Sequence, residues 1–260
     1  MYNQATTVRE AALSCLNQQC EPIEILFSDD CSTDESFAIL QVLAANYRGP
    51  HSLRVQSNPV NLGIGRHYNE AIPRAQGELL ITAAGDDVCT VDRVADLLKA
   101  WDQSEGKVDL ISSYLTDIDP QGNHLGQLQV DDLSQLHSID DWVNARPYVI
   151  GAAHAFTKRL HQHFGPFISE LNYEDQIMAL RASALGGGVT IKKSLVFYRR
   201  GGLSAVKNGR KDLLRKHKNH YGFYKQMQLD LLRINRADLW RFKFRWRLAR
   251  SAIYLWILER

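Results

Sequence analysis

The sequence lacks several patterns that would place it in a specialised class of protein. Its four cysteines form no Cys-x-x-Cys pair, which argues against a zinc site or a redox dithiol and favours reduced thiols. Its start has no basic segment followed by an apolar one, as a secretory signal would have. Its last apolar run, residues 251–258, is far shorter than the ~20 residues that span a bilayer. These absences predict a cytoplasmic protein.

Internal repeats and low-complexity segments are also absent. Apolar residues make up 45% of the 260 residues and charged residues 23%, which is the profile of a globular protein. A chain of this length can form one large α/β domain, or one domain with an appendage.

Acidic residues are scarce in the last part of the chain. Residues 207–260 contain 15 Lys and Arg against 4 Asp and Glu, whereas residues 1–206 contain 16 against 25. The net charge of +2 therefore conceals an acidic part and a basic part, which we expect to differ in role. We predict one domain over residues 1–204 and a basic, aromatic, helical extension over residues 205–260.

Paired aspartates follow two of the strands predicted in residues 1–204. Short β-rich runs alternate with helical patterns there, which predicts an α/β fold with a mostly parallel, Rossmann-type sheet and flanking helices. Asp29 and Asp30 follow "IEILFS", and Asp86 and Asp87 follow "ELLITAA". Because ligands of such sheets bind beyond the carboxyl ends of the strands, these pairs predict one acidic cleft. It would suit a divalent metal, a ribose or the N–H edge of a base. Taken singly, each pair fits turn formation or helix capping better than a cleft, and only together do the pairs favour a cleft.

Six segments, in consistent order, resemble family 2 glycosyltransferases with the GT-A fold. They are "YNQ", "SDDCSTDES", "NPVNLGIGRHYNEAIPRAQGELLI", "AAGDDV", "YEDQ" and "FYRRGGLS". The resemblance covers the chain from Tyr2 to about Ser204. It implies an enzyme that uses a nucleotide-diphospho-sugar as donor.

The resemblance also implies a role for each acidic element. Asp30 would contact the nucleobase or ribose, and Asp86 and Asp87 would hold ribose and a divalent metal, Mg or Mn, on the sugar diphosphate. Asp175, beside Glu174, would take the proton from the acceptor hydroxyl, with inversion at the sugar. The alternative for Glu174 and Asp175 is a helix N-terminus, where their charge interacts favourably with the helix dipole.

Three arginines are candidates for contact with the diphosphate. Arg66 follows a glycine-rich turn, and Arg199 and Arg200 end a late predicted strand. The alternative is that all three are solvated side chains.

The chain departs from the family in three places. Ala84 stands where the family usually has an aspartate, and Gly201 stands where a metal-ligating histidine often occurs. The apolar strand that normally precedes the Tyr-Asn pair is missing, because Met1 directly precedes Tyr2. We therefore expect a truncated or misassigned start, the loss of the central strand, and unpaired edges on its two neighbours.

Aromatic and apolar residues recur at near-helical spacing in the basic extension, with Arg and Lys between them. They are Trp240, Phe244, Leu248, Ala252 and Trp256. This pattern predicts either a helix in peripheral contact with an anionic membrane or a helix packed on the catalytic domain.

Together these features predict a metal-dependent glycosyltransferase with a saccharide or lipid-linked acceptor, in bacterial cell-surface polysaccharide synthesis. We expect it in the cytoplasm or peripherally at the inner face of the plasma membrane. The alternatives are a catalytically impaired remnant that binds nucleotide sugar weakly, and a membrane-surface interaction protein that acts through its basic tail. Nucleic acid is not an expected partner, because the acidic half has no matching readout motif.

Overall fold

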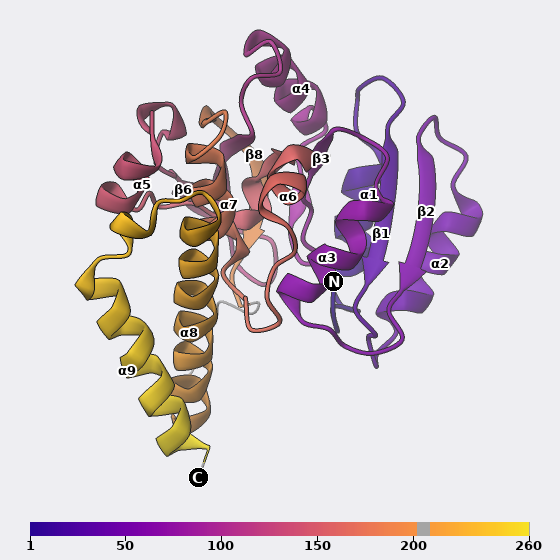
Figure 1. Cartoon of the computed structure of the whole chain (residues 1–260). Helices are drawn as coiled ribbons and strands as arrows, with labels where there is room; N and C mark the ends of the chain where they lie inside the picture. The colour runs from indigo at the N-terminus through magenta and orange to yellow at the C-terminus, as the bar shows by residue number, and fades with distance from the viewer. Residues whose placement is uncertain (202–208, 260) are drawn as a thin grey trace.

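The computed structural model describes residues 1–201 and 209–259, in which strands and helices alternate along most of the chain (Figure 1). The strands are β1 (Glu24–Asp29), β2 (Ser52–Ser57), β3 (Leu79–Ile81), β4 (Val88–Cys89), β5 (Leu110–Ile118), β6 (His124–Leu128), β7 (Ala155–Thr157) and β8 (Gly188–Arg199). The helices are α1 (Val8–Leu16), α2 (Ser36–Asn46), α3 (Ile64–Arg74), α4 (Arg93–Gln103), α5 (Ile139–Ala145), α6 (Lys158–Phe164), α7 (Glu174–Ser183), α8 (Arg210–Arg233) and α9 (Phe242–Leu258). The α/β fold class is confirmed.

The sheet is mixed, which corrects the expectation of a mostly parallel one. β1 pairs with β2 in parallel, and a second sheet has the order β3-β7-β5-β8-β4 with β6 beside β5. In the second sheet β5 and β8 are parallel, whereas the other pairings are antiparallel. Parallel neighbours need a long crossover. The chain supplies one between β5 and β8, but β6 follows β5 directly, through the hairpin that "DPQGN" predicts.

Two strands of the described structure have a single strand neighbour on one side only. Within the described residues, β1 pairs only with β2 and β3 only with β7. Met1 lies beside the end of β1, where its amino group donates to the Ser28 carbonyl at 2.9 Å and its carbonyl accepts from the Asp30 N–H at 2.8 Å.

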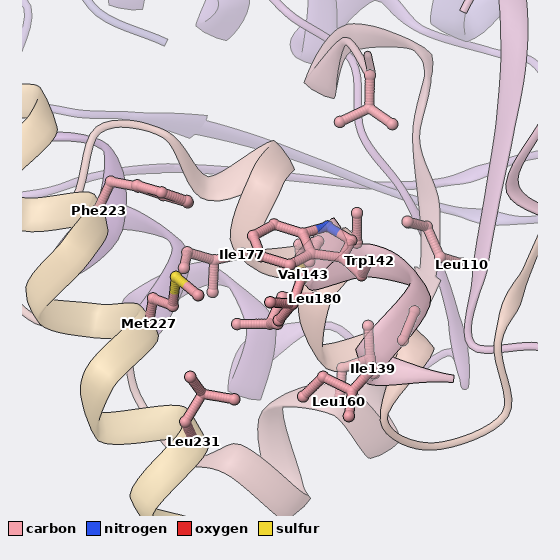
Figure 2. Packing of buried hydrophobic residues seen from close by; sticks show 14 of the residues in the cluster. Leu110, Ile139, Trp142, Val143, Leu160, Ile177, Leu180, Phe223, Met227 and Leu231 are labelled. Atoms are coloured by element: carbon pink, nitrogen blue, oxygen red, sulfur yellow. The ribbon is translucent and has the colours of Figure 1, made fainter. Parts of the chain in front are cut away.

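The largest core cluster joins the mixed sheet to α8 (Figure 2). Leu110 of β5, Trp142 of α5 and Ile177 of α7 are fully buried together with Met227 of α8. Fully burying one such side chain contributes about 1.5–3 kcal/mol, so α8 is held by the core of the preceding residues. The proposed domain boundary at 204 falls outside the described residues and stays a prediction.

A buried ion pair makes a second connection between α7 and α8. Arg181 donates from Nε to Asp230 Oδ2 at 2.8 Å and from Nη2 to Oδ1 at 3.1 Å, and neither residue is exposed. Gln226 donates to the same Asp230 carboxylate at 2.9 Å. Because both charges are removed from water, the loss of either one would leave the other buried without an ionic partner.

The predicted aromatic stripe of the extension is divided between core and solvent. Trp240 and Phe244 are buried in the main core cluster and Leu248 packs against it, so this half follows the packed alternative. Ala252 and Trp256 are exposed. The stripe expected from the sequence is therefore mainly the face by which the extension packs.

Nowhere in residues 1–201 and 209–259 does a helix combine the length and apolar character that crossing a bilayer requires.

Candidate active site

Asp30 lies directly beyond β1, held by the loop that leads into α3. Its carboxylate accepts from the backbone N–H groups of Leu62 and Gly63, at 2.9 and 2.8 Å, and from the Asn58 amide at 2.8 Å. Burial acts to raise the pKa of Asp30, but these hydrogen bonds outweigh it and hold the pKa below its ordinary value. Gly63 has φ +74°, a backbone conformation that glycine adopts without strain. The site therefore keeps Asp30 ionised and fixed in direction.

The neighbouring residue Asp29 stabilises the turn that follows β1. Asp29 is fully buried and accepts hydrogen bonds from the Ser32 N–H at 2.9 Å and the Ser57 hydroxyl at 2.8 Å. These contacts close the turn after β1, as the capping alternative predicts for this residue.

Asp86 and Asp87 lie in the loop between β3 and β4, which is fixed from two sides. The Thr7 hydroxyl donates to the Gly85 carbonyl at 2.9 Å, and the Arg199 backbone N–H donates to the Asp87 carboxylate at 2.8 Å. The Arg199 guanidinium donates to the Asp86 carbonyl at 3.0 Å. The loop is therefore positioned by the start of α1 and the end of β8.

The two adjacent carboxyls are poorly solvated. Burial raises the pKa of Asp87 to about 7, and the charge of Asp86 adds to this effect. Burial likewise raises the pKa of Asp86. A bound cation would lower both values, because it favours the ionised forms.

These residues fit a divalent metal of the Mg type, which takes one or two carboxylates together with phosphate oxygens and water. Over the described ranges, no group of three or more His, Cys, Asp or Glu residues could hold a metal. Asp86 and Asp87 would thus supply part of a coordination shell that the donor's phosphates complete.

The candidate arginines lie in different surroundings. Arg199 is 7% exposed, and its guanidinium also donates to the Pro120 carbonyl at 3.0 Å and to Glu10 at 2.7 Å. Its donors are thus directed at protein acceptors. Arg200 pairs with Asp117, whereas Arg66 is an exposed side chain in the first turn of α3.

Glu174 and Asp175 begin α7, as the helix-start alternative predicts, and both are only partly exposed. Burial raises the pKa of both carboxyls, and the negative charge of Asp175 raises that of Glu174 further. The Gln176 N–H donates to Asp175 at 2.7 Å and fixes its direction. A carboxyl with a raised pKa binds a proton more readily than an ordinary aspartate does, which suits a general base.

Direct contacts connect the segments that bear these acids. The Met1 carbonyl accepts a hydrogen bond from the Asp30 N–H. A Cβ atom added at Gly85 would lie 3.1 Å from Met1 Cβ. Met1 therefore contacts both the end of β1 and the loop that carries Asp86. The Thr82 hydroxyl donates to the Gly151 carbonyl at 2.7 Å. A Cβ atom at position 151 would lie 2.9 Å from Glu174 Oε1, so the β3 end also adjoins α7.

Helix α3 makes the third connection. It begins at the loop that binds Asp30, and its Gly65 N–H donates to the Leu171 carbonyl at 3.1 Å, just before α7. Tyr68, one turn further on, is close enough to α7 that the charges of Glu174 and Asp175 add to burial in raising its pKa. We call Asp30, Asp86, Asp87, Glu174 and Asp175 the acidic site.

Sequence reasoning missed the residues that hold the acidic site in place. Asn58, Gly65 and Tyr68 lie in the quoted segment "NPVNLGIGRHYNEAIPRAQGELLI", so their family pattern was visible but their partners were not. The contact of Gly151 with α7 had no signal in the sequence, because only the fold brings residues 151 and 174 together.

A hollow of about 510 Å³ lies elsewhere. It is lined by residues at the start of β8, including Gly188 and Val189, whereas Arg199 ends that strand beside Asp87. The acidic site therefore lies at the opposite end of β8 from this hollow.

Solved structures of GT-A glycosyltransferases share this mixed α/β architecture. S. aureus TarS, solved with UDP-GlcNAc, superposes with a TM-score of 0.65 at 20% identity, over 98% of this chain and 70% of that one. The mannosyltransferase PcManGT of Pyrobaculum calidifontis, solved with GDP-Man and Mn²⁺, gives 0.62 at 15% identity, over 99% and 72%. At these identities the likeness establishes the fold.

The chain belongs to glycosyl transferase family 2, whose family model matches residues 1–165. Protein Rv1520 of Mycobacterium tuberculosis is 34% identical over 90 residues, which are 34% of this chain and 25% of that protein. An uncharacterized glycosyltransferase of Haemophilus influenzae is 29% identical over 94 residues, 36% of each chain. The matched stretch thus spans about a quarter to a third of the relatives' length.

Proposed function

We propose that this protein transfers a sugar from a nucleotide diphosphate to a hydroxyl group of a saccharide or lipid-linked acceptor. The observation that carries the proposal is the contact between the segments bearing Asp30, Asp87 and Asp175 within a GT-A fold. The family membership supports sugar transfer as the reaction class.

Each part of the acidic site has a role in this proposal. Asp30 binds the nucleoside through its remaining acceptor capacity, and Asp86 and Asp87 hold ribose and Mg or Mn. The metal, when bound, neutralises charge that develops on the departing diphosphate. Arg66, exposed at the start of α3, is the arginine we propose for contact with the diphosphate. Arg199 positions Asp86 and Asp87 through its hydrogen bonds to the Asp87 carboxylate and the Asp86 carbonyl.

Asp175 is the proposed base. It accepts the proton of the acceptor hydroxyl while that oxygen forms a bond to the anomeric carbon. The bond from this carbon to the diphosphate breaks, and the nucleoside diphosphate leaves with the electron pair. Attack from the face opposite the leaving group inverts the configuration. Burial raises the pKa of Asp175 to about 6 and that of Glu174 to about 8, so Glu174 is protonated over the range in which Asp175 ionises.

The pH dependence of turnover tests the base. Because Asp175 acts in its ionised form, kcat/KM should fall as pH drops through its raised pKa, well above the ordinary aspartate value. Glu174→Gln resembles the protonated Glu174 present in that pH range and should leave this acidic limb in place. Initial rates across a pH series for both proteins measure the position of the limb. An acidic limb at the ordinary aspartate value would contradict the assignment.

Asp87→Asn tests the metal role through two effects of opposite direction. With Mn²⁺ present, the variant should bind UDP about tenfold more weakly or worse, whereas without metal the two proteins should bind alike. The pKa of Asp87 is raised from 3.8 to about 7 in the folded state, so the metal-free protein loses stability as pH rises from 3.8 to about 7 and no more beyond it. Asp87→Asn should therefore raise the melting temperature, and raise it more at pH 8 than at pH 5.

Calorimetry and thermal melts measure these effects, with Asp102→Asn on the exposed side of α4 as the matched control. UDP and GDP are the first nucleotides to test, because the similar solved structures contain UDP-GlcNAc and GDP-Man. Folded wild-type protein that binds neither nucleotide with Mn²⁺ would favour the impaired-remnant alternative, which rests on Ala84 and Gly201.

The acceptor and the setting belong to the same proposal. A lipid-linked acceptor in cell-surface polysaccharide synthesis would bring the protein to the inner face of the plasma membrane. The basic extension supports this setting by its charge.

A further inference from the structure

Helix α9 is apolar on two opposite faces, but the described structure covers only one of them. Phe244 and Ser251 are buried on the inner face, where Leu248 and Leu255 are half-buried. The helix lies beside α8, and the pair projects from the α/β body with the C-terminal end at the far tip (Figure 1). An apolar face of a helix is ordinarily buried against another element, so the outer face indicates a binding partner.

The outer face carries a continuous apolar stripe that differs from the one expected from the sequence. Its residues follow each other at steps of four and three, which places them on one side of an α-helix. We call them the outer stripe: Phe242, Trp246, Ala249, Ile253 and Trp256. Phe242 is 80% exposed, and Trp246, Ile253 and Trp256 are each more than half exposed. Contiguous exposed apolar surface of this kind marks an interaction site.

The charges beside the outer stripe decide what kind of partner fits. Within α9 there are four basic residues and no acidic one. Lys243 and Arg250 flank the stripe on one side and Arg245 on the other, by their helical positions. Arg250 stacks over the Trp246 ring at 4.7 Å from its centroid. A second copy packed along this stripe would bring the same positive charges together, whereas an anionic surface would neutralise them.

A hollow next to the stripe has matching chemistry. It measures about 350 Å³ and is lined by Gln228, Trp240, Arg245, Leu248 and Ala249. Mainly apolar walls with one arginine suit an acyl chain next to an anionic headgroup.

We infer that the outer stripe of α9 is a membrane-binding face that inserts its aromatic side chains into the interface of an anionic bilayer. The helix would lie in the plane of the interface, with Lys243, Arg245 and Arg250 at the level of the headgroups. This inference is independent of the proposed sugar transfer, because vesicle binding is measured without donor or acceptor.

Vesicle co-sedimentation of the full chain tests it. We expect binding to vesicles containing roughly one third phosphatidylglycerol, little binding to pure phosphatidylcholine, and weaker binding as salt is added. Trp246→Ser with Ile253→Ser should lower the partition coefficient about tenfold or more, because it removes apolar contact area. Val42→Ser with Leu125→Ser is the matched control, since these side chains are equally exposed on α2 and β6.

A charge variant separates the two contributions. Lys243→Gln with Arg245→Gln should weaken binding to anionic vesicles, whereas Lys99→Gln with Arg48→Gln, exposed elsewhere, should not. Melting curves check that every variant stays folded, as expected for exposed positions. Equal binding to neutral and anionic vesicles, or full binding by the stripe variant, would overturn the inference. So would a dimer in analytical ultracentrifugation that the stripe variant loses, in the absence of vesicle binding.

Discussion

Asp175→Asn is expected to lower kcat by about 10²–10⁴-fold, because an asparagine amide cannot accept the proton of the acceptor hydroxyl as the Asp175 carboxylate would. The change keeps the shape of the side chain and its position at the start of α7, so the nucleotide affinity should stay within about twofold. Single-turnover transfer and calorimetric nucleotide binding measure the two quantities separately. The comparison variant is Glu70→Gln, an exposed carboxylate of α3 that pairs with Arg74 and should leave both unchanged.

Residual turnover within tenfold of wild type would exclude Asp175 as the base. Loss of nucleotide binding together with turnover would instead assign this residue to the donor site. The prediction requires the α7 N-terminus to face the acidic loop of Asp86 and Asp87, and the contacts through Thr82 and Gly151 support that arrangement.

Asp230→Asn is expected to destabilise the protein by about 3–5 kcal/mol, the usual cost of leaving a buried charge without its partner. Arg181 is completely buried and Asp230 is 2% exposed, so water cannot replace the lost carboxylate. Denaturant unfolding followed by circular dichroism measures the free energy of unfolding. Because Asp230 lies in α8, a large effect would also show that this helix unfolds together with the preceding α/β residues.

Two further variants sharpen this test. Arg181→Met with Asp230→Leu removes both charges and should recover much of the lost stability, since apolar side chains fill the same space. Asp238→Asn breaks an exposed pair with Arg236 and should leave the unfolding midpoint unchanged. A midpoint equally unchanged by Asp230→Asn would mean that α8 is an independent appendage, as the predicted boundary at 204 implies.

The positions of the acidic residues along the chain could be predicted, but the residues that hold their side chains in place could not. Asp30, Asp86 and Asp87 follow apolar runs that end at the same kind of strand terminus, and this pattern depends only on local sequence. Arg199 shows the limit of such reasoning. Its charge and its place at the end of β8 indicated a diphosphate contact, whereas its guanidinium donates to Glu10, Pro120 and Asp86. Those acceptors come from three distant segments that only folding brings together.

In the C-terminal extension, too, only the local features could be predicted. Its helical character and positive charge could be predicted from the sequence, because both follow from residue type and spacing. Which of its two apolar stripes would pack inward was not legible, because Phe244 and Trp246 are equally apolar. Phe244 became the buried side chain because α8 packs against that face.

By itself, the sequence determined the α/β class, the family and the order of the acidic elements, since these depend on local patterns of charge and hydrophobicity. The tertiary structure alone decided that the sheet is mixed, which arginine is held by protein acceptors, and which face of α9 meets the solvent. These outcomes depend on contacts between residues far apart in the chain, whose energies no local pattern contains.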